Sequence, residues 1–191
     1  TMVAAMSRRR PQLVAQSTTS LDLVSDGRMV LGLGLGVDSH GEYSAFDEPA
    51  EDDRARAKAL DSGIDQLKQM LTGEPVPDAG NRVTTVSGVQ EPRVPIWIGG
   101  TAKYTAAPRR VRRHGVEGLA LAGGGTWSPN IVTTALQGGG LSAGEIDLAL
   151  VGGTHPNPDA LAQAGATWCI PEIQPGATAS EAKALATTPP N

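Results

Sequence analysis

Closely spaced glycines follow three apolar runs of the sequence, and they are the residues best suited to make room for a ligand. The runs cover residues 29–35, 94–98 and 116–122, and the glycines at their ends include Gly34, Gly36, Gly99, Gly100, Gly123 and Gly124. A residue without a side chain lets a backbone or a planar ligand approach closely. Each run is short and apolar, which is typical of a buried strand rather than a surface helix. The sequence therefore predicts strands that open onto a ligand site.

The glycines also have a plainer interpretation, because any one of them could serve only a tight turn between a strand and a helix. Their repeated placement at strand ends favours ligand contact. The run Gly32-Leu33-Gly34-Leu35-Gly36 does not fit the dinucleotide-binding fingerprint, since its third glycine comes one position early and no helix opens there. The sequence also has no Gly-Lys followed by Ser or Thr, which excludes a P-loop.

His40 is a weak candidate for catalysis. It lies with Asp38 and Glu42 on the loop expected after the first apolar run, and a histidine can donate a proton near neutral pH. A solvated loop histidine is the commoner state, so both interpretations stay open. We expect His114 to be structural and His155 to be exposed on a loop. The spacing of the histidines does not match a metal site, so no metal is expected.

Composition favours a small-molecule partner over nucleic acid or membrane. The chain has 191 residues, which suits one domain, and a formal net charge of −4 with both signs interspersed. Such a surface exerts no general attraction on nucleic acid or on an anionic membrane. Aromatic residues make up only 3% of the chain, so its core must depend on Leu, Val, Ile and Ala.

The single cysteine, Cys169, excludes an intrachain disulfide and a multi-cysteine zinc site. Its apolar neighbours predict an inert thiol in a buried strand, and a reducing cytoplasm fits this cysteine usage. No apolar run approaches about 18 residues, and no secretory leader pattern is visible. We therefore expect a soluble cytoplasmic protein.

Helices and strands are expected to alternate along the chain. Strands are predicted over residues 29–35, 94–100, 116–122, 146–151 and 167–170, after a partial strand within 1–6. Helices are predicted over residues 11–24, 52–71, 106–113, 128–137, 159–164 and 180–186. Residues 75–92 form an irregular excursion with a poor hairpin near 82–86. This alternation predicts βαβ units and a parallel sheet, in which ligands gather at the carboxyl ends of the strands.

Several of these segments together resemble the luciferase-like monooxygenases. The matching segments, which follow one another in the family's order, are Arg8-Arg9-Arg10-Pro11, residues 20–28 and 30–36, 42–46, 60–76, Val89-Gln90-Glu91-Pro92 with the strand to Gly100, and residues 164–168. The resemblance implies an α/β fold of the (β/α)8 TIM-barrel type. The barrel expected for this chain is incomplete, with strands three to eight only and the first of these partial. One incomplete domain is expected over residues 1–186, followed by a loose tail over 187–191.

The resemblance also implies a flavin cofactor, either FMN or a deazaflavin (coenzyme F420), in an oxidoreductase of monooxygenase type. Gly34 and Gly36 would let the isoalloxazine edge approach. Gly99, Gly100 and Thr101 would offer backbone N–H groups and a hydroxyl to its phosphate, and Gly123 and Gly124 could close the phosphate pocket. One arginine among residues 8–10 could reach a flavin phosphate or a carboxylate.

The family's first two strands are expected before residue 1, so this chain would leave two strand edges exposed. A homodimer or a partner chain could cover those edges. Three hypotheses follow: an N-terminally truncated flavin-dependent oxidoreductase with doubtful activity, a flavin-binding protein without turnover, and a degenerate gene product that folds poorly.

Overall fold

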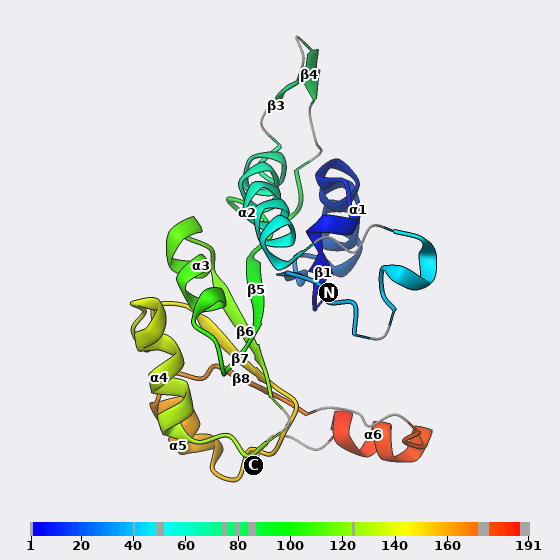
Figure 1. Ribbon diagram of the computed structural model, residues 1–191. Coiled ribbons are helices and arrows are strands. Elements are labelled where there is room, and N and C mark those ends of the chain that lie inside the picture. The colour runs from blue at the N-terminus through cyan, green and yellow to red at the C-terminus, as the bar shows by residue number, and fades with distance from the viewer. Residues whose placement is uncertain are drawn as a thin grey trace. The chain divides into compact units, whose positions relative to one another are not determined.

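The structure is a computed structural model that describes residues 2–39, 41–48, 52–73, 76–78, 81–83, 87–123, 125–171 and 176–187 (Figure 1). The chain divides into two compact units, Thr1–Ile98 and Gly99–Asn191.

The first unit is built on three parallel strands. They are β1 (Ala4–Ala5), β2 (Leu31–Gly34) and β5 (Ile96–Thr101), the last of which runs on into the second unit. β1 pairs with β2 in parallel, with Ala4 opposite Leu33, and β2 pairs with β5, with Leu31 opposite Ile96. Short 3-10 helices follow β1 at Met6–Arg8 and β2 at Ser44–Phe46.

Two helices, α1 (Pro11–Ser25) and α2 (Asp53–Met70), lie side by side in this unit (Figure 1). α1 begins at a proline, whose fixed φ suits a first helical position. α2 begins after Asp52, whose carboxylate accepts the N–H of Ala55 at 2.7 Å. Both predicted helices are confirmed, and their ends agree with the predicted ends within one or two residues. α2 buries Leu60, Ile64 and Leu67, the apolar spacing from which it was predicted.

The segment before β5 contains a small antiparallel hairpin, β3 (Val76–Asp78) with β4 (Asn81–Val83), in which Val76 lies opposite Val83. The predicted hairpin is confirmed, although its strands begin earlier than expected. Turn-forming residues dominate this stretch, so its hydrophobic pattern locates the strands poorly.

The second unit alternates strands and helices. Its elements are α3 (Ala106–His114), β6 (Gly118–Ala122), α4 (Pro129–Gly139), β7 (Asp147–Val151), α5 (Pro158–Gln163), β8 (Trp168–Ile170) and α6 (Ala179–Thr187). β6 pairs in parallel with β7, and β7 with β8. Figure 1 shows α3, α4 and α5 along one side of these strands. The core consists of strand residues such as Leu119, Leu121, Leu148 and Leu150, all fully buried.

These parallel strands with intervening helices confirm the predicted α/β class. Within the described residues, β1 pairs only with β2 and β8 pairs only with β7. Both end strands are therefore open, as expected for an incomplete barrel, since a closed barrel has no edge strand. None of the described helices is long and apolar enough to cross a membrane.

Candidate cofactor-binding site

Asp38 organises the loop that follows β2. Its Oδ1 atom accepts the backbone N–H of Tyr43 at 2.7 Å and that of Ser44 at 3.1 Å. These two hydrogen bonds hold the pKa of the Asp38 carboxyl below its ordinary value. Asp38 therefore stays ionised and folds the loop back toward the strand ends.

Tyr43 fills the space beside the carboxyl ends of β1 and β2. Its side chain is 2% exposed, and its hydroxyl lies 2.7 Å from the Oγ of Ser7. Gly36 has a φ of +77°, and a Cβ there would overlap the Tyr43 hydroxyl. Both the backbone conformation and this neighbour require glycine at position 36.

Arg8 clamps this loop through a bidentate ion pair with Glu48. Its Nε lies 2.5 Å from Oε2 and its Nη2 lies 2.8 Å from Oε1. The guanidinium also lies over the rings of Tyr43 and Phe46, at 5.2 and 5.7 Å from their centroids. Since the hydrogen bonds to Arg8 lower the pKa of Glu48, the pair is charged at neutral pH. The Arg8 side chain is therefore bound by groups of its own chain.

Three further predicted glycines lie against side chains of their own unit. A Cβ at Gly34 would come 2.6 Å from Cγ2 of Val3, and one at Gly123 would come 2.9 Å from Cζ2 of Trp127. A Cβ at Gly100 would overlap that of Ala107, at the start of α3. Close packing therefore gives each of them a structural reason to be glycine, and ligand contact stays a prediction.

The end of β5 has the features of an anion site. Gly99 and Gly100 are half-buried there, and Thr101 is exposed. α3 begins five residues later, after Thr105, which forms no side-chain cap, and its first turn contains no acidic residue. Uncapped N–H groups and the positive end of the helix dipole favour a phosphate or carboxylate. That these residues hold the phosphate of a flavin stays a prediction.

Trp127 packs against Gly123 and Gly153, a contact that was not predicted from the sequence. It is 4% exposed, and its indole N–H donates to the carbonyl of Gly152 at 2.7 Å. The His155 ring stacks on the indole with a centroid distance of 6.4 Å, so the prediction of an exposed His155 is wrong: the ring is half-buried. Its place two positions after Gly123-Gly124-Gly125 is a sequence signal that could have indicated Trp127.

The buried hydrogen-bond network around Asp22 was also not predicted from the sequence. Its carboxylate is fully buried in α1 and accepts the N–H groups of Val89 and Gln90 at 2.7 and 3.1 Å. The Gln90 side-chain amide donates to Asp22 Oδ1 at 2.7 Å and to the Met29 carbonyl at 2.7 Å. This network fixes the chain that leads into both β2 and β5.

Other predicted residues contribute less. His40 and Gly124 lie outside the described residues. His114 is buried at the end of α3, and Cys169 is half-buried rather than buried, with its pKa raised by burial. In the described part of the chain, no group of three or more His, Cys, Asp or Glu residues could hold a metal ion.

The open parallel α/β fold and its glycine-rich strand ends define the class of the protein. The family model for luciferase-like monooxygenases matches residues 1–123. The chain belongs to this family.

Solved structures share the fold at low sequence identity. Monooxygenase RslO1 from Streptomyces bottropensis is 20% identical, with a TM-score of 0.58 over 86% of this chain and 52% of its own. The coenzyme F420-dependent tetrahydromethanopterin reductase from Methanopyrus kandleri is 18% identical, with a TM-score of 0.55 over 75% of this chain and 46% of its own. The oxygenating constituent of 3,6-diketocamphane monooxygenase from Pseudomonas putida, solved in complex with FMN, is 13% identical, with a TM-score of 0.59 over 79% and 46%.

This likeness confirms the predicted barrel type, which is open at both end strands here. The chain spans about half the length of these proteins.

Proposed function

We propose that this chain contributes the flavin-binding part of a luciferase-like oxidoreductase that uses FMN or coenzyme F420. The observation that carries the proposal is the family match over residues 1–123. Two of the similar structures support the cofactor class, since one is named as F420-dependent and the other was solved with FMN. The bound cofactor would supply hydride transfer or oxygen activation to a small organic substrate.

In this proposal the end of β5 holds the phosphate. Backbone N–H groups at Gly99 and Gly100, the Thr101 hydroxyl and the uncapped first turn of α3 offer donors without an opposing carboxylate in that turn. FMN and F420 both carry phosphate, so this chemistry is common to both. Gly123 and Gly124 are proposed to close the phosphate pocket.

Gly34 and Gly36 are proposed to admit the ring edge. Tyr43 and Ser7 would present hydroxyls beside Gly36, and the buried Tyr43 ring would exclude water there. His40 stays the weak candidate for proton transfer.

A second candidate function is flavin binding without turnover. Asp38 accepts the backbone N–H of Tyr43, and Arg8 forms an ion pair with Glu48. These three charged side chains therefore bind groups of their own chain rather than face a substrate. Such commitments stabilise a site but leave those groups unsuited to proton transfer. This observation favours a binding protein as the alternative to an enzyme.

Cofactor titration tests both functions. FMN should bind saturably and more tightly than riboflavin, which lacks the phosphate, and F420 is titrated separately. Thr101→Ala should weaken FMN binding several-fold and leave riboflavin binding unchanged, whereas the exposed Ser142→Ala in the same unit should change neither. Oxidation of the reduced bound cofactor then distinguishes an enzyme from a binding protein. Absence of binding by both FMN and F420 would refute both functions.

Coverage of the open β1 and β8 edges by a second copy or a partner chain is also a proposal, as is a cytoplasmic location. Trp168 on β8 is 54% exposed, which is consistent with an uncovered edge. Sedimentation of the purified chain would show whether it self-associates.

A further inference from the structure

The last turn of α4 contains two glycines that its own conformation does not require. Gly138 and Gly139 precede Gly140, which ends the helix with a φ of +70° and therefore has its own reason to be glycine. Neither Gly138 nor Gly139 has a positive φ. Glycine within a helix is less favourable than alanine, so these two residues need another explanation. The contacts of α4 with α3 supply it.

Gly139 allows the backbones of α3 and α4 to approach closely. Figure 1 shows the two helices side by side in the second unit. A Cβ at the buried Gly139 would lie 2.6 Å from Cβ of Pro108, 2.8 Å from its carbonyl carbon and 2.9 Å from its carbonyl oxygen. Pro108 belongs to the first turn of α3, and its ring and backbone cannot rotate away. An alanine at position 139 would therefore displace that turn.

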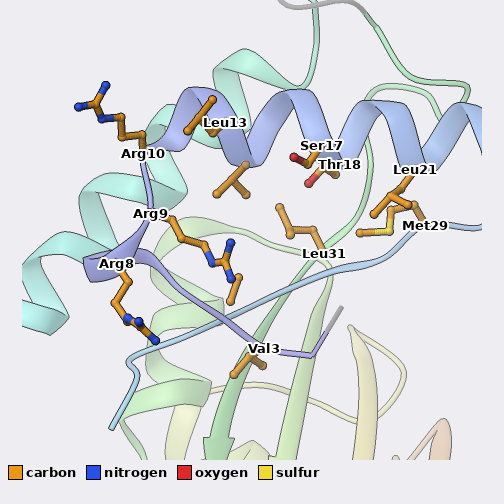
Figure 2. A pocket seen from close by; sticks show the side chains of 12 residues that line it. Val3, Arg8, Arg9, Arg10, Leu13, Ser17, Thr18, Leu21, Met29 and Leu31 are labelled. Atoms are coloured by element: carbon orange, nitrogen blue, oxygen red, sulfur yellow. The ribbon is translucent and has the colours of Figure 1, made fainter. Parts of the chain in front are cut away.

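Such close approach is not general among the helices of this chain. In the first unit a cavity of about 500 Å³ lies along α1, where Leu13 and Leu21 are among its lining residues (Figure 2). A methyl group added on that side of α1 would find free space. At Gly139 it would find the backbone of α3.

Gly138 makes a second contact with the start of α3. A Cβ at this position would lie 2.6 Å from Cγ2 of Thr105, the residue that precedes the helix. The Gly138 carbonyl accepts the Nε–H of Arg109 at 3.3 Å. The last turn of α4 thus contacts Thr105, Pro108 and Arg109, which span the first turn of α3.

Strand β5 contacts the same turn through another glycine. A Cβ at Gly100 would overlap that of Ala107, which is 6% exposed. The first turn of α3 is therefore packed against Gly100 of β5 and against Gly139 of α4. Close packing of this kind leaves the turn little freedom to move.

This turn has few N–H groups to offer a ligand. The N–H of Arg109 donates to the Thr105 carbonyl at 3.1 Å, and Pro108 has no N–H. The helical hydrogen bonds therefore leave out the N–H groups of Ala106 and Ala107. Where these two groups lie depends on the glycine contacts just described.

We propose that Gly139 is a positioning residue for the cofactor phosphate: by packing on Pro108 it holds the N–H groups of Ala106 and Ala107 beside the end of β5. The inference rests on the proposed function, which places the phosphate at that strand end. Gly139 acts through α3 and does not touch the phosphate. Donors that are held in place before binding favour an anion, because they need no ordering when it binds.

Titration of the whole chain with FMN and with riboflavin tests the proposal, because only FMN carries a phosphate. Gly139→Ala should weaken FMN binding about tenfold, as loss of hydrogen bonds to a charged group does, and leave riboflavin binding nearly unchanged. For a chain that binds F420 instead, the same comparison uses F420 and its phosphate-free deazariboflavin core.

Gly140→Ala is the matched control. It adds the same methyl group one position later, where φ is positive but no described residue contacts a Cβ. The substitution strains the end of α4 without displacing α3. We expect it to lower the melting temperature and to leave the binding of both ligands nearly unchanged.

A second pair of substitutions decides the matter where Gly139→Ala does not fold. A methyl group at position 138 would meet only the side chain of Thr105, and Thr105→Ser removes the Cγ2 atom that it would overlap. Gly138→Ala should weaken FMN binding several-fold. The double variant with Thr105→Ser should regain the affinity of Thr105→Ser alone.

Three results would overturn the inference. One is a folded Gly139→Ala chain that binds FMN normally or loses affinity for FMN and riboflavin equally. Another is an FMN-specific loss in Gly140→Ala. The third is a Gly138→Ala chain that shows no loss, or a loss that Thr105→Ser does not relieve. A cooperatively melting chain that binds neither FMN nor F420 refutes the proposed function itself, so the two failures are distinguishable.

Discussion

The carboxylate of Asp22 and the side-chain amide of Gln90 meet at 2.7 Å, although 68 positions separate them in the sequence. Through this contact the end of α1 holds the segment that leads into β5. The contact matters for stability, because the carboxylate is fully buried and both of its oxygens accept hydrogen bonds.

Replacing Asp22 with Asn should destabilise the first unit. The amide nitrogen of Asn would oppose an N–H donor that now meets an oxygen, so at least one buried group would lose its partner. We expect a loss of about 2–3 kcal/mol in the free energy of unfolding, measured with denaturant. Asp53→Asn is the control, since Asp53 is 82% exposed in α2 and should cost little. Equal losses in both variants would contradict the importance of the Asp22 network.

Acid should weaken the same network. Burial raises the pKa of Asp22, but the hydrogen bonds from Gln90 and Val89 outweigh burial and leave the pKa below its ordinary value. A carboxyl whose pKa is lower in the folded state stabilises the fold fully above its unfolded pKa of about 3.9. That stabilisation declines as pH falls below this value toward the folded pKa. Unfolding curves between about pH 6 and 2 should therefore show a loss that Asp22→Asn diminishes. An unchanged pH profile in the variant would disprove the assignment.

Gly36→Ala should cost more than an ordinary glycine substitution. The change forces alanine into a φ of +77° and against the Tyr43 hydroxyl. Gly115→Ala is the control, because Gly115 has a φ of +57° with nothing within 4 Å of a Cβ. We expect about 1 kcal/mol at Gly115 and a clearly larger loss at Gly36. Tyr43→Phe should restore part of the loss at Gly36, measured by a double-mutant cycle. Additive losses would show that the hydroxyl is not the obstacle.

Trp127→Phe should loosen the glycine-rich turns of the second unit. The variant keeps an aromatic ring but loses the indole donor to Gly152, so the buried carbonyl is left unsatisfied. We expect a loss of about 1–2 kcal/mol and faster amide exchange at residues 152–154. Trp168→Phe, on a half-exposed side chain, is the comparison and should leave that exchange unchanged.

Local patterns were enough to predict most elements. α2 has apolar residues at helical spacing with charges between them, and β2 and β5 are short apolar runs that end in glycine. The order of these elements was therefore predictable, and so was the parallel sheet. Its open, incomplete form was expected from the family resemblance.

Contacts between distant residues were not predictable in the same way. Nothing near Gly36 in the sequence indicates that Tyr43 folds back on it, and nothing near Asp22 indicates Gln90. Packing of this kind is decided by tertiary structure, so a single sequence gives little warning of it.

The three tryptophans are distributed so that each unit has its own optical reporter. Trp97, on β5, is the tryptophan of the first unit and is 5% exposed, whereas Trp127 and Trp168 belong to the second. A chain carrying Trp127→Phe and Trp168→Phe would emit from the first unit alone, and one carrying Trp97→Phe would emit from the second. Their emission spectra on heating would show whether the two units melt together or one after the other.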